Sequence, residues 1–332
     1  MESDAAAPDL SISILTWNTR ACLKACLDSI RRHTHEIRYE IIVVDNGSTD
    51  GAFEMLKQEY PGVRAIRHEE NLGFTAGNNV ALRAARGRYI LLLNSDTVVR
   101  EGCLDLWIRL MEGDPAVGVS APKMFYPDGR LYLSIHPRFP DPLCCLSERS
   151  ILTELCPRSG WVEHFRRRYF YTAESDYASD RDIAWGIGAA LMLRRAAVEA
   201  TGLLDVGFFA FFEEIDYCLR ARAAGWRLRY YHQPEVIHIS AGSLRQDYDR
   251  ITHIWHASRF YFYRKHFSAP AMFALKALTA TGIVIRLIKL LFRIRWVSTA
   301  GSEWRGTFKT YVRILLMSVL YPLFGPRGKS KS

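Results

Sequence analysis

Three clusters of polar side chains follow apolar runs in the first hundred residues, and a fourth cluster is acidic. Thr16-Trp17-Asn18 follows one run, Asp45-Asn46-Gly47-Ser48-Thr49-Asp50 a second, and Asn94-Ser95-Asp96-Thr97 another. The densest acidic group, Glu213-Glu214-Ile215-Asp216, comes directly after two phenylalanines. Carboxylates, amides and hydroxyls can hydrogen-bond a ligand, hold a cation or accept a proton. The four clusters are therefore the first candidates for a functional site.

The segments between these clusters alternate between short β-branched runs and stretches of helical period. Strands are expected at 10–15, 40–44, 63–67 and 89–93, and helices at 21–32, 51–60 and 75–85. This βαβαβαβ order predicts an α/β fold with a mainly parallel, doubly wound sheet. Ligands of such sheets bind outside the carboxyl ends of the strands. The three clusters that follow strands are thus expected to face one site.

The pattern is weak over residues 127–182 and returns in the small-residue segment 185–193, which we interpret as a strand or buried turn. The acidic group then opens a helix that is expected to stop at Gly225. No glycine-rich phosphate loop is present, so phosphate binding would rest on a metal ion and side chains.

Positive charge is concentrated at the carboxyl end of the 332-residue chain. The formal net charge is +9, yet residues 267–332 contain eleven basic residues and one acidic residue, which leaves the first 266 residues close to neutral. A basic tail interleaved with aliphatic residues favours an anionic membrane surface as its partner. We therefore expect no nucleic-acid binding. The N-terminus lacks a charged-then-apolar leader, so we expect a cytoplasmic protein.

Two helices are expected in this tail, at 271–295 and 308–323. The longest uncharged run, 314–326, has 13 residues and contains Pro322, which is shorter than the ~18 residues of a membrane-spanning helix. On a helical wheel three cations share one face and four aliphatic residues the opposite one: Arg286, Lys289 and Arg293, against Val284, Leu287, Ile288 and Leu291. This pattern is typical of a helix that lies in the membrane interface, and we expect residues 271–324 to bind there.

Four sequence blocks occur in a characteristic order: 13–18 with 43–50; 71–74 with 78–79; 93–96; and 202–205 running into 212–220, with His238 beyond. Together they resemble the inverting glycosyltransferases with the A-type (GT-A) fold, called family 2, and within them the rhamnosyltransferase-like branch. The resemblance covers roughly residues 10–245 and implies a Rossmann-like, mainly parallel sheet flanked by helices. Residues 10–266 would form the GT-A domain, with a nucleotide-binding half (10–126) and an acceptor half (127–266), between an N-terminal tail (1–9) and a helical membrane-associating tail (267–332).

The resemblance implies that Asp45 reads the nucleotide base by accepting a hydrogen bond from a ring N–H. Asp-Asn-Gly is also a sequence that strongly favours a turn, so the alternative is that Asp45 lies in a solvated turn. Trp185 and Gly188 could line the sugar site, since an indole stacks on a pyranose and a glycine permits close approach, although core packing would explain them equally well. The full expected set of nucleotide-sugar contacts is Thr16, Asn18, Asp45, Asn46, Asn71, Gly73, Asn78, Asn94, Ser95, Trp185 and Gly188.

The family's metal motif, normally two aspartates flanking one residue, reads Asn94-Ser95-Asp96 in this chain. Mg²⁺ or Mn²⁺ on a diphosphate is commonly held by one or two carboxylates together with phosphate oxygens and water. Asp96 would supply the charge, although a helix N-cap is its alternative role. The resemblance makes His238 a second metal ligand or a phosphate contact; a packed strand residue is the alternative.

The acidic group is the candidate for the catalytic base, which must remove the proton of the attacking sugar hydroxyl. The family usually has Glu-Asp where this chain has Glu213-Glu214, so Glu214 ranks first, followed by Glu213 and Asp216. The alternative role of these residues is a charged first helical turn.

The expected function is transfer of a sugar, with rhamnose favoured, from a dTDP or UDP donor to a hydroxyl of a glycan or lipid-linked acceptor in cell-surface polysaccharide synthesis. The enzyme would work at the inner face of the cell membrane with Mg²⁺ or Mn²⁺. The departures at Asn94 and Glu214 leave a second hypothesis open, a catalytically weak nucleotide-sugar-binding scaffold. A nucleic-acid-binding protein is a third, which the near-neutral charge of residues 1–266 disfavours.

Overall fold

The computed structural model describes residues 7–142, 144, 160–239, 248–296 and 303–321. The chain forms two compact units: 1–138 with 171–246, and 139–170 with 247–332. In the second unit, residues 248–266, which belong to the expected domain over residues 10–266, form a helix that packs with the C-terminal helices. Residues 1–6 of the expected N-terminal tail, and 297–302 and 322–324 of the expected membrane-binding segment, lie outside the described residues.

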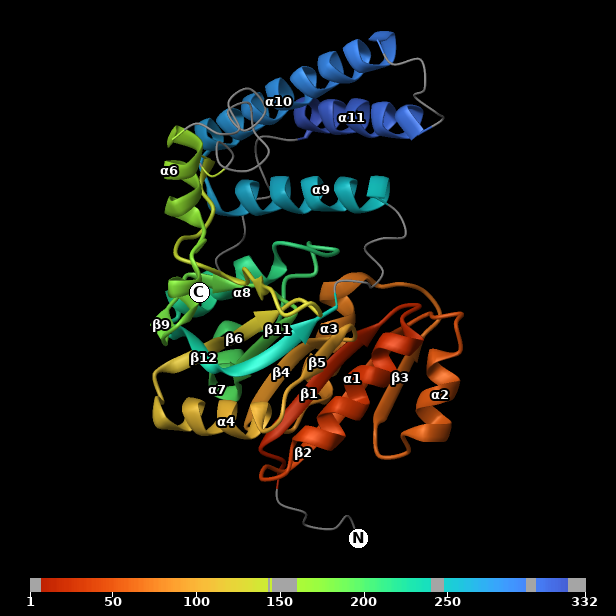
Figure 1. Cartoon of the computed structure of the whole chain (residues 1–332), viewed down its shortest axis with the longest axis vertical. Helices are drawn as coiled ribbons and strands as arrows, with labels where there is room; N and C mark the ends of the chain where they lie inside the picture. The colour runs from red at the N-terminus through yellow and green to blue at the C-terminus, as the bar shows by residue number, and fades with distance from the viewer. Residues whose placement is uncertain (1–6, 143, 145–159, 240–247, 297–302, 322–332) are drawn as a thin grey trace, which may run out of the picture. The chain divides into compact units, whose positions relative to one another are not determined.

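A large mixed sheet forms the centre of the first unit, with the main strand order β3-β2-β1-β4-β11-β6-β12-β5 (Figure 1). The strands are β1 (Leu10–Thr16), β2 (Tyr39–Asn46), β3 (Arg64–His68), β4 (Tyr89–Asn94), β5 (Thr97–Val99), β6 (Val117–Phe125), β7 (Leu131–Tyr132), β9 (Arg181–Asp182), β11 (Ala190–Arg194) and β12 (Arg227–His238). Strands β1 to β4 pair in parallel, as do β6 and β12. Antiparallel pairs join β11 to β4 and β6, and β5 to β12. The expected mainly parallel α/β sheet is confirmed.

Helices cover both faces of this sheet. They are α1 (Arg20–His33), α2 (Ala52–Glu59), α3 (Gly73–Ala84), α4 (Cys103–Gly113), α7 (Arg195–Thr201) and α8 (Glu213–Ala223). Leu10, Ile12 and Ile14 of β1 share a core with α1, α2 and α4. Ser13 points to the opposite face, where its Oγ donates to Asn78 Oδ1 of α3 at 3.0 Å. The near-continuous apolar runs of β2 and β4 follow from this two-sided burial.

The parallel strands end at one edge of the sheet, which we call the carboxyl edge. The register sets Thr16 level with Asp45 and Leu15 level with Asn94. Strand β12 ends at this edge with His238, and the antiparallel β11 begins there with Ala190. The short strands β8 (Ile135–His136) and β10 (Trp185–Gly186) form a separate pair. The polar clusters predicted from the sequence therefore meet at the carboxyl edge.

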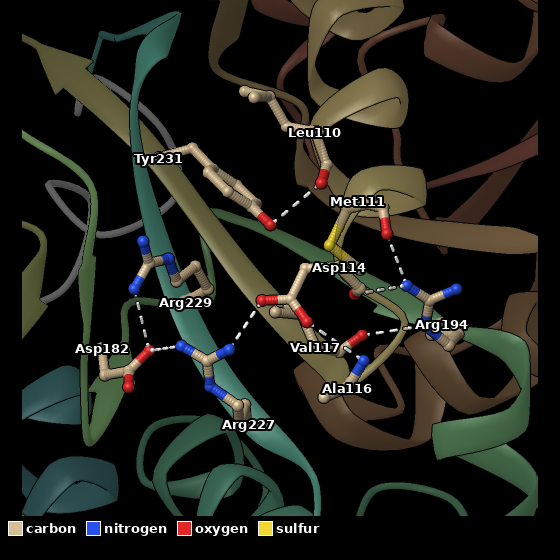
Figure 2. Close-up of polar contacts among 10 residues, drawn as sticks. All are labelled: Leu110, Met111, Asp114, Ala116, Val117, Asp182, Arg194, Arg227, Arg229 and Tyr231. Atoms are coloured by element: carbon tan, nitrogen blue, oxygen red, sulfur yellow. Dashed lines mark hydrogen bonds and ion pairs between the residues drawn. The ribbon is translucent and has the colours of Figure 1, made fainter.

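Charged side chains also gather at the opposite edge, where β6 and β12 begin and β11 ends. Figure 2 shows Arg194 of β11 beside the end of α4. Its guanidinium donates to the backbone carbonyls of Met111, Asp114 and Val117 at 2.6, 3.0 and 2.9 Å. The planar fork of arginine suits such multiple acceptors, so this side chain ties three strand and helix ends together.

Two further arginines complete what we call the amino-edge network. Arg227 pairs with the carboxylates of Asp114 and Asp182 at 2.7 and 2.9 Å, and Arg229 pairs with Asp182 at 3.1 Å (Figure 2). Tyr231, on the same strand, donates its hydroxyl to the carbonyl of Leu110 at 3.2 Å. Arg227 and Arg229 are therefore each paired with a carboxylate, whereas Arg194 is satisfied by carbonyl oxygens.

The second unit contains helices α6 (Gly160–Tyr169), α9 (Tyr248–His266), α10 (Ala269–Trp296) and α11 (Glu303–Leu320). Arg259 of α9 donates to Thr279 Oγ1 of α10 at 2.6 Å, and Lys276 of α10 donates to the carbonyls of Val319 and Tyr321 at 2.9 and 2.8 Å. Charge and hydrogen bonding at the end of α11 thus fix it against the start of α10.

Helix α10 differs from the expectation that no tail helix could span a membrane. Its segment Ala269–Phe292 is 24 residues long with a mean hydropathy of 1.7, and by length and composition it could cross a bilayer. The expectation counted only uninterrupted uncharged runs, whereas this segment reaches its length despite Lys276, Arg286 and Lys289. Apolar side chains exposed on α10 and α11 are Phe273, Val284, Ile288, Leu291, Phe292, Phe308, Leu316, Val319 and Leu320.

Candidate active site

The carboxylate of Asp45, near the end of β2, is completely buried and only partly satisfied. Its Oδ1 accepts a hydrogen bond from the backbone N–H of Ser48 at 2.9 Å. Its Oδ2 has no hydrogen-bond partner among the residues that the structure describes, and Arg67 Nε lies 3.8 Å away, beyond hydrogen-bond distance. A buried acceptor without a donor costs free energy, so this position favours a ligand that brings an N–H group.

Three of the predicted contact residues tie the end of β2 to the start of α3. Asn46 Nδ2 donates to the carbonyl of Gly73 at 3.1 Å and to Asn71 Oδ1 at 3.3 Å. Asn71 Oδ1 also accepts from the N–H of Gly73 at 2.8 Å. Gly73 has φ +84°, and a Cβ there would lie 2.6 Å from the carbonyl oxygen of Phe209. These contacts explain why asparagine and glycine occur at the three positions, since they form the turn. A contact with the nucleotide-sugar donor would be an additional role.

Asn18 and Asn78 also make contacts within the protein. Asn18, at φ 53°, accepts the N–H of Thr49 at 2.8 Å and donates its own N–H to Ser48 Oγ at 3.0 Å. Asn78 donates its amide to the carbonyl of Phe74 at 3.0 Å, and its Oδ1 accepts the hydroxyl from β1 described above. Their predicted contacts with a nucleotide sugar therefore stay predictions.

A chain of hydroxyl groups links the ends of β1 and β4. Thr16 Oγ1 lies 2.9 Å from Thr19 Oγ1, which lies 2.9 Å from Ser95 Oγ. Thr16 and Ser95 were expected at the site, whereas Thr19 was not. The sequence offered one indication that Thr19 has a role, its position directly before α1. A threonine at such a position usually caps the helix. Its side chain makes no capping hydrogen bond and joins the two strand ends instead.

Asp96 and His238 come together at the carboxyl edge although 142 positions separate them in the sequence. Asp96 Oδ1 lies 3.3 Å from His238 Nε2, and both residues are buried. The pairing of β5 with β12 sets Thr97 opposite His238, and the N–H of Ile239 donates to the carbonyl of Asp96 at 2.9 Å. The ring of Tyr132 lies 5.1 Å from that of His238. His238 is thus both the last strand residue and the neighbour of the predicted metal ligand.

This pair fits a divalent cation that takes most of its ligands from elsewhere. One carboxylate oxygen and one imidazole nitrogen face each other, a donor set compatible with Mn²⁺ and, through the carboxylate, with Mg²⁺. Within the described ranges no group of three or more His, Cys, Asp and Glu side chains could hold a metal ion. Within the described residues this pair would supply one carboxylate and one imidazole ligand, and a diphosphate and water could supply others.

Glu213 and Glu214 open α8 as a closely coupled pair of carboxyl groups. Glu213 is buried and Glu214 partly exposed. Burial, followed by the charge of Glu214, raises the pKa of Glu213 well above its usual range, and burial raises the pKa of Glu214 to about 7. The Oε2 atom of each glutamate has no hydrogen-bond partner among the described residues. A carboxylate with a pKa near neutrality that a ligand can reach has the properties of a general base.

Asp216, the third candidate for the base, is engaged in an ion pair. Its Oδ2 accepts from Arg220 Nε at 2.8 Å, and the side chain is completely buried. Arg220 also donates to the carbonyls of Thr201 and Leu203 at 2.8 and 2.9 Å. These contacts anchor α8 to the end of α7 and give Asp216 a structural role, while its part in catalysis stays a prediction.

Gly188 lies beside the glutamate pair, and Trp185 lies on the neighbouring two-stranded sheet. A Cβ on Gly188 would be 3.6 Å from Glu214 Cβ. Trp185 stacks on His136 with ring centroids 3.6 Å apart and an angle of 5° between the planes, and its Nε1 donates to the carbonyl of Arg138 at 3.1 Å. The indole is thus fixed on one face and one edge while it stays partly exposed.

Asn79, which was quoted in the sequence blocks but given no role, makes a buried contact with the loop before α8. Its Nδ2 donates to the carbonyl of Leu204 at 2.8 Å, and its Oδ1 accepts the N–H of Leu204 at 3.0 Å. Neighbouring Asn78 faces β1 instead. Sequence alone could not separate the two adjacent asparagines, because the partner of Asn79 is 125 positions away.

Comparison with known proteins agrees with this architecture. The sequence matches the family model described as glycosyl transferase family 2 over residues 11–202. It is also 28% identical over 249 residues to the N-acetylglucosaminyl-diphospho-decaprenol L-rhamnosyltransferase of Mycobacterium tuberculosis, which covers 72% of this chain and 78% of that protein.

Solved structures share the fold at low sequence identity. The mannosyltransferase PcManGT from Pyrobaculum calidifontis, in complex with GDP-Man and Mn²⁺, has a TM-score of 0.53 and 16% identity, covering 95% of this chain and 87% of that one. GalNAc-T7 with UDP, GalNAc and Mn²⁺ has a TM-score of 0.51 and 17% identity, covering 79% and 51% of the two chains. The fold is thus of the GT-A type, and because the family model matches more than half of its length, the chain belongs to glycosyl transferase family 2 and is a glycosyltransferase.

Proposed function

We propose that this enzyme transfers a sugar, with inversion, from a nucleoside diphosphate to a hydroxyl of a glycan or lipid-linked acceptor. The observation that carries the proposal is the coupled pair Glu213 and Glu214, with Glu214 partly exposed and of pKa about 7. Inversion requires one displacement at the anomeric carbon, in which the acceptor oxygen attacks as the diphosphate leaves. A base on the acceptor side is then needed to take the hydroxyl proton.

Glu214 is the proposed base. As the new glycosidic bond forms, the proton of the acceptor hydroxyl passes to a carboxylate oxygen of Glu214. The partial exposure of this side chain supports contact with the acceptor, and its buried Oε2 has no hydrogen-bond partner within the described part of the chain. Burial is what raises the pKa of Glu214, while the hydrogen bond from the more deeply buried Glu213 lowers it in part.

Asp96 and His238 would hold the Mg²⁺ or Mn²⁺ ion, with Asn94 as a neutral neighbour. When bound, the ion would neutralise charge on the departing diphosphate. The Mn²⁺ in the complexes of PcManGT and GalNAc-T7 supports this choice of cofactor. The residues themselves contribute a fixed position, because β5 and β12 pair at Thr97 and His238.

The donor is proposed to be a dTDP or UDP sugar, with rhamnose favoured. Asp45 Oδ2, buried and without a hydrogen-bond partner among the described residues, is suited to the ring N–H of thymine or uracil. The relative from Mycobacterium tuberculosis is named as a rhamnosyltransferase that acts on N-acetylglucosaminyl-diphospho-decaprenol. It supports rhamnose as the sugar and a lipid-linked acceptor.

A transfer assay with nucleotide sugars tests this function. The purified protein is incubated with dTDP-rhamnose, UDP-glucose or GDP-mannose and a lipid-diphosphate sugar acceptor, with Mg²⁺ or Mn²⁺ and with EDTA. We expect transfer that EDTA abolishes and that Asp96→Ala reduces by ~100-fold or more. Tight donor binding without transfer to any acceptor would select the scaffold hypothesis instead, and unchanged donor affinity in Asp96→Ala would contradict the metal site.

The second unit is proposed to bind the inner face of an anionic membrane through residues 271–324. Helix α10 exposes apolar side chains that include Ile288 and Leu291, and its sequence places Arg286 and Lys289 on the opposite face. An interfacial helix should be released from vesicles by high salt or carbonate, whereas a spanning Ala269–Phe292 segment would need detergent. Removal of residues 267–332 should abolish binding to vesicles that contain phosphatidylglycerol; continued sedimentation would contradict this role.

A further inference from the structure

We propose that Asn79 is a positioning residue for the catalytic glutamates: it holds the loop 202–212, whose conformation sets where Glu213 and Glu214 stand relative to the donor. The inference rests on the proposed function, because it concerns the base of that reaction. Asn79 lies on α3, in the half of the chain that is expected to bind the nucleotide. The proposal gives it a role in placing the glutamates, which lie in the expected acceptor half.

The first observation is the geometry of the Asn79 amide. Both of its polar atoms bond to the backbone of one residue, Leu204, at 2.8 and 3.0 Å, and the side chain is 1% exposed. The Asn79 amide bonds Leu204 as a neighbouring strand would, through one N–H and one carbonyl. It thereby satisfies two buried backbone groups of the loop. The loop is therefore fixed to α3 at its beginning.

The second observation is an anchor near the end of the loop. The carbonyl of Phe209 accepts the N–H of Phe74 at 2.7 Å and the N–H of Thr75 at 3.4 Å, both in the first turn of α3. Gly73 allows this approach, because a Cβ there would come within 2.6 Å of the same carbonyl. Helix α3 thus holds the loop at two points, in addition to the hydrogen bond from Arg220 to the carbonyl of Leu203.

The third observation is strain between the second anchor and the glutamates. Phe211 and Phe212 both have φ 67°, a conformation that non-glycine residues rarely adopt. Each such residue is strained and persists only where its surroundings hold it. Phe212 directly precedes Glu213, so this pair of dihedral angles fixes the direction in which α8 begins.

The same turn of α3 also contacts the donor side. Asn46, next to the proposed base reader Asp45, donates to the carbonyl of Gly73 at 3.1 Å. Helix α3 therefore touches both the strand end that would bind the nucleotide and the loop that carries the glutamates. A shift of the loop relative to α3 would therefore move the catalytic glutamates. The site proposed for the nucleotide would stay in place.

The test compares Asn79→Leu, which keeps the size of the side chain but removes both hydrogen bonds, with the wild-type enzyme. Because a displacement of about 1 Å can cost ~100-fold in rate, we expect kcat to fall at least ~10-fold, while the donor Kd stays within about twofold. Ser120→Ala is the control: it removes a buried hydrogen bond from Trp107, 2.7 Å long, elsewhere in the sheet. It should lower Tm and leave kcat unchanged.

A second readout does not depend on turnover. The carboxyl groups of Glu213 and Glu214 are titrated by infrared or ¹³C spectroscopy, with Asp216 and Cys218 as the other ionisable groups of α8 that face them. In Asn79→Leu the midpoint should fall towards the ordinary glutamate value, because a displaced loop admits water. This readout judges the positioning role even if the wild-type protein transferred no sugar, which would refute only the proposed function.

Phe211→Gly covers the case in which Asn79→Leu does not fold. Glycine accepts φ 67° without strain, so the fold is retained while the hold on α8 is loosened, and we again expect a lower kcat at constant donor Kd. The proposal is overturned if folded variants keep both the wild-type kcat and the wild-type titration. It is also overturned if donor affinity falls as much as kcat.

Discussion

The two edges of the central sheet use charged side chains in opposite ways. At the amino edge Arg194 bonds three carbonyls, and Arg227 and Arg229 pair with Asp114 and Asp182 (Figure 2). At the carboxyl edge and the nearby start of α8, carboxylate oxygens are buried without a hydrogen-bond partner in the described part of the chain; they belong to Asp45, Glu213 and Glu214.

The difference follows from what each edge must do. Satisfied charges lower the energy of the folded chain by themselves, whereas an unsatisfied carboxylate is stabilised only when a ligand supplies a proton, an N–H or a cation. Substitutions at the amino edge should therefore change stability and spare activity. Substitutions at the carboxyl edge should do the reverse.

The largest effect is expected from Glu214→Gln, which keeps the shape of the side chain but cannot take a proton. General-base catalysis contributes about 100- to 10,000-fold, so kcat should fall by an amount in that range. Steady-state transfer kinetics measure it, and Glu213→Gln is the matched comparison with a smaller loss. If Glu213→Gln were the more damaging change, the buried glutamate would be the base.

The pH dependence should show the same contrast. Because the base must be ionised and the pKa of Glu214 is about 7, kcat/KM should fall about tenfold per pH unit below about pH 7. The free energy of unfolding should change with pH in the opposite direction. In the folded protein the pair stays protonated at pH values above 4.5, the ordinary pKa of a glutamate. Its contribution to stability is therefore present below that value and is lost as pH rises towards 7.

The check for this sign is the difference in Tm between wild type and Glu214→Gln. We expect the variant to gain relative stability as pH rises from 5 to 8, because the neutral amide has no charge to bury. A difference that does not change with pH would mean that the pair is not desolvated.

At the amino edge, Arg194→Leu should lower the free energy of unfolding without changing kcat. The substitution leaves the carbonyls of Met111, Asp114 and Val117 without this donor, and an unsatisfied buried group costs about 1–3 kcal/mol. Urea unfolding at pH 7 measures the loss. A parallel loss of kcat would show that the two edges are coupled.

The smallest effect is expected from Asp182→Asn. Its side chain is 60% exposed, although it pairs with both Arg227 and Arg229. Exposed ion pairs contribute about 0.2–1 kcal/mol, so the free energy of unfolding should change by less than about 1 kcal/mol. A larger loss in the same unfolding experiment would mean that the network is cooperative.

The first half of the sheet could be predicted because its signals are local. The helix expected at 75–85 is Gly73–Ala84, and the strand expected at 89–93 is Tyr89–Asn94. No such signal revealed β12, in which the pairing with β6 shifts between Tyr230 and Glu235. Its alternation is interrupted there by Pro234, and the antiparallel insertion of β11 depends on pairing between distant segments.

The candidate site follows the same division. Asp45, Asp96 and the glutamates were predicted because each follows or opens an element with a clear period. Thr19 and Asn79 were missed because their partners, Ser95 and Leu204, are 76 and 125 positions away. A single sequence carries no record of such contacts.

Strand β12 joins the two edges, since Arg227 begins it and His238 ends it. Between Tyr230 and Glu235 it holds three more residues than the paired segment of β6. Pairing resumes beyond it with Glu235 level with Lys123, so the bulge takes up an odd number of extra residues without turning the rest of the strand over. The face that His238 takes is set by its pairing with β5 and not by the length of the bulge. Length changes in this segment can therefore be inherited without loss of the contact with Asp96, provided that residues 235–238 keep their pairing.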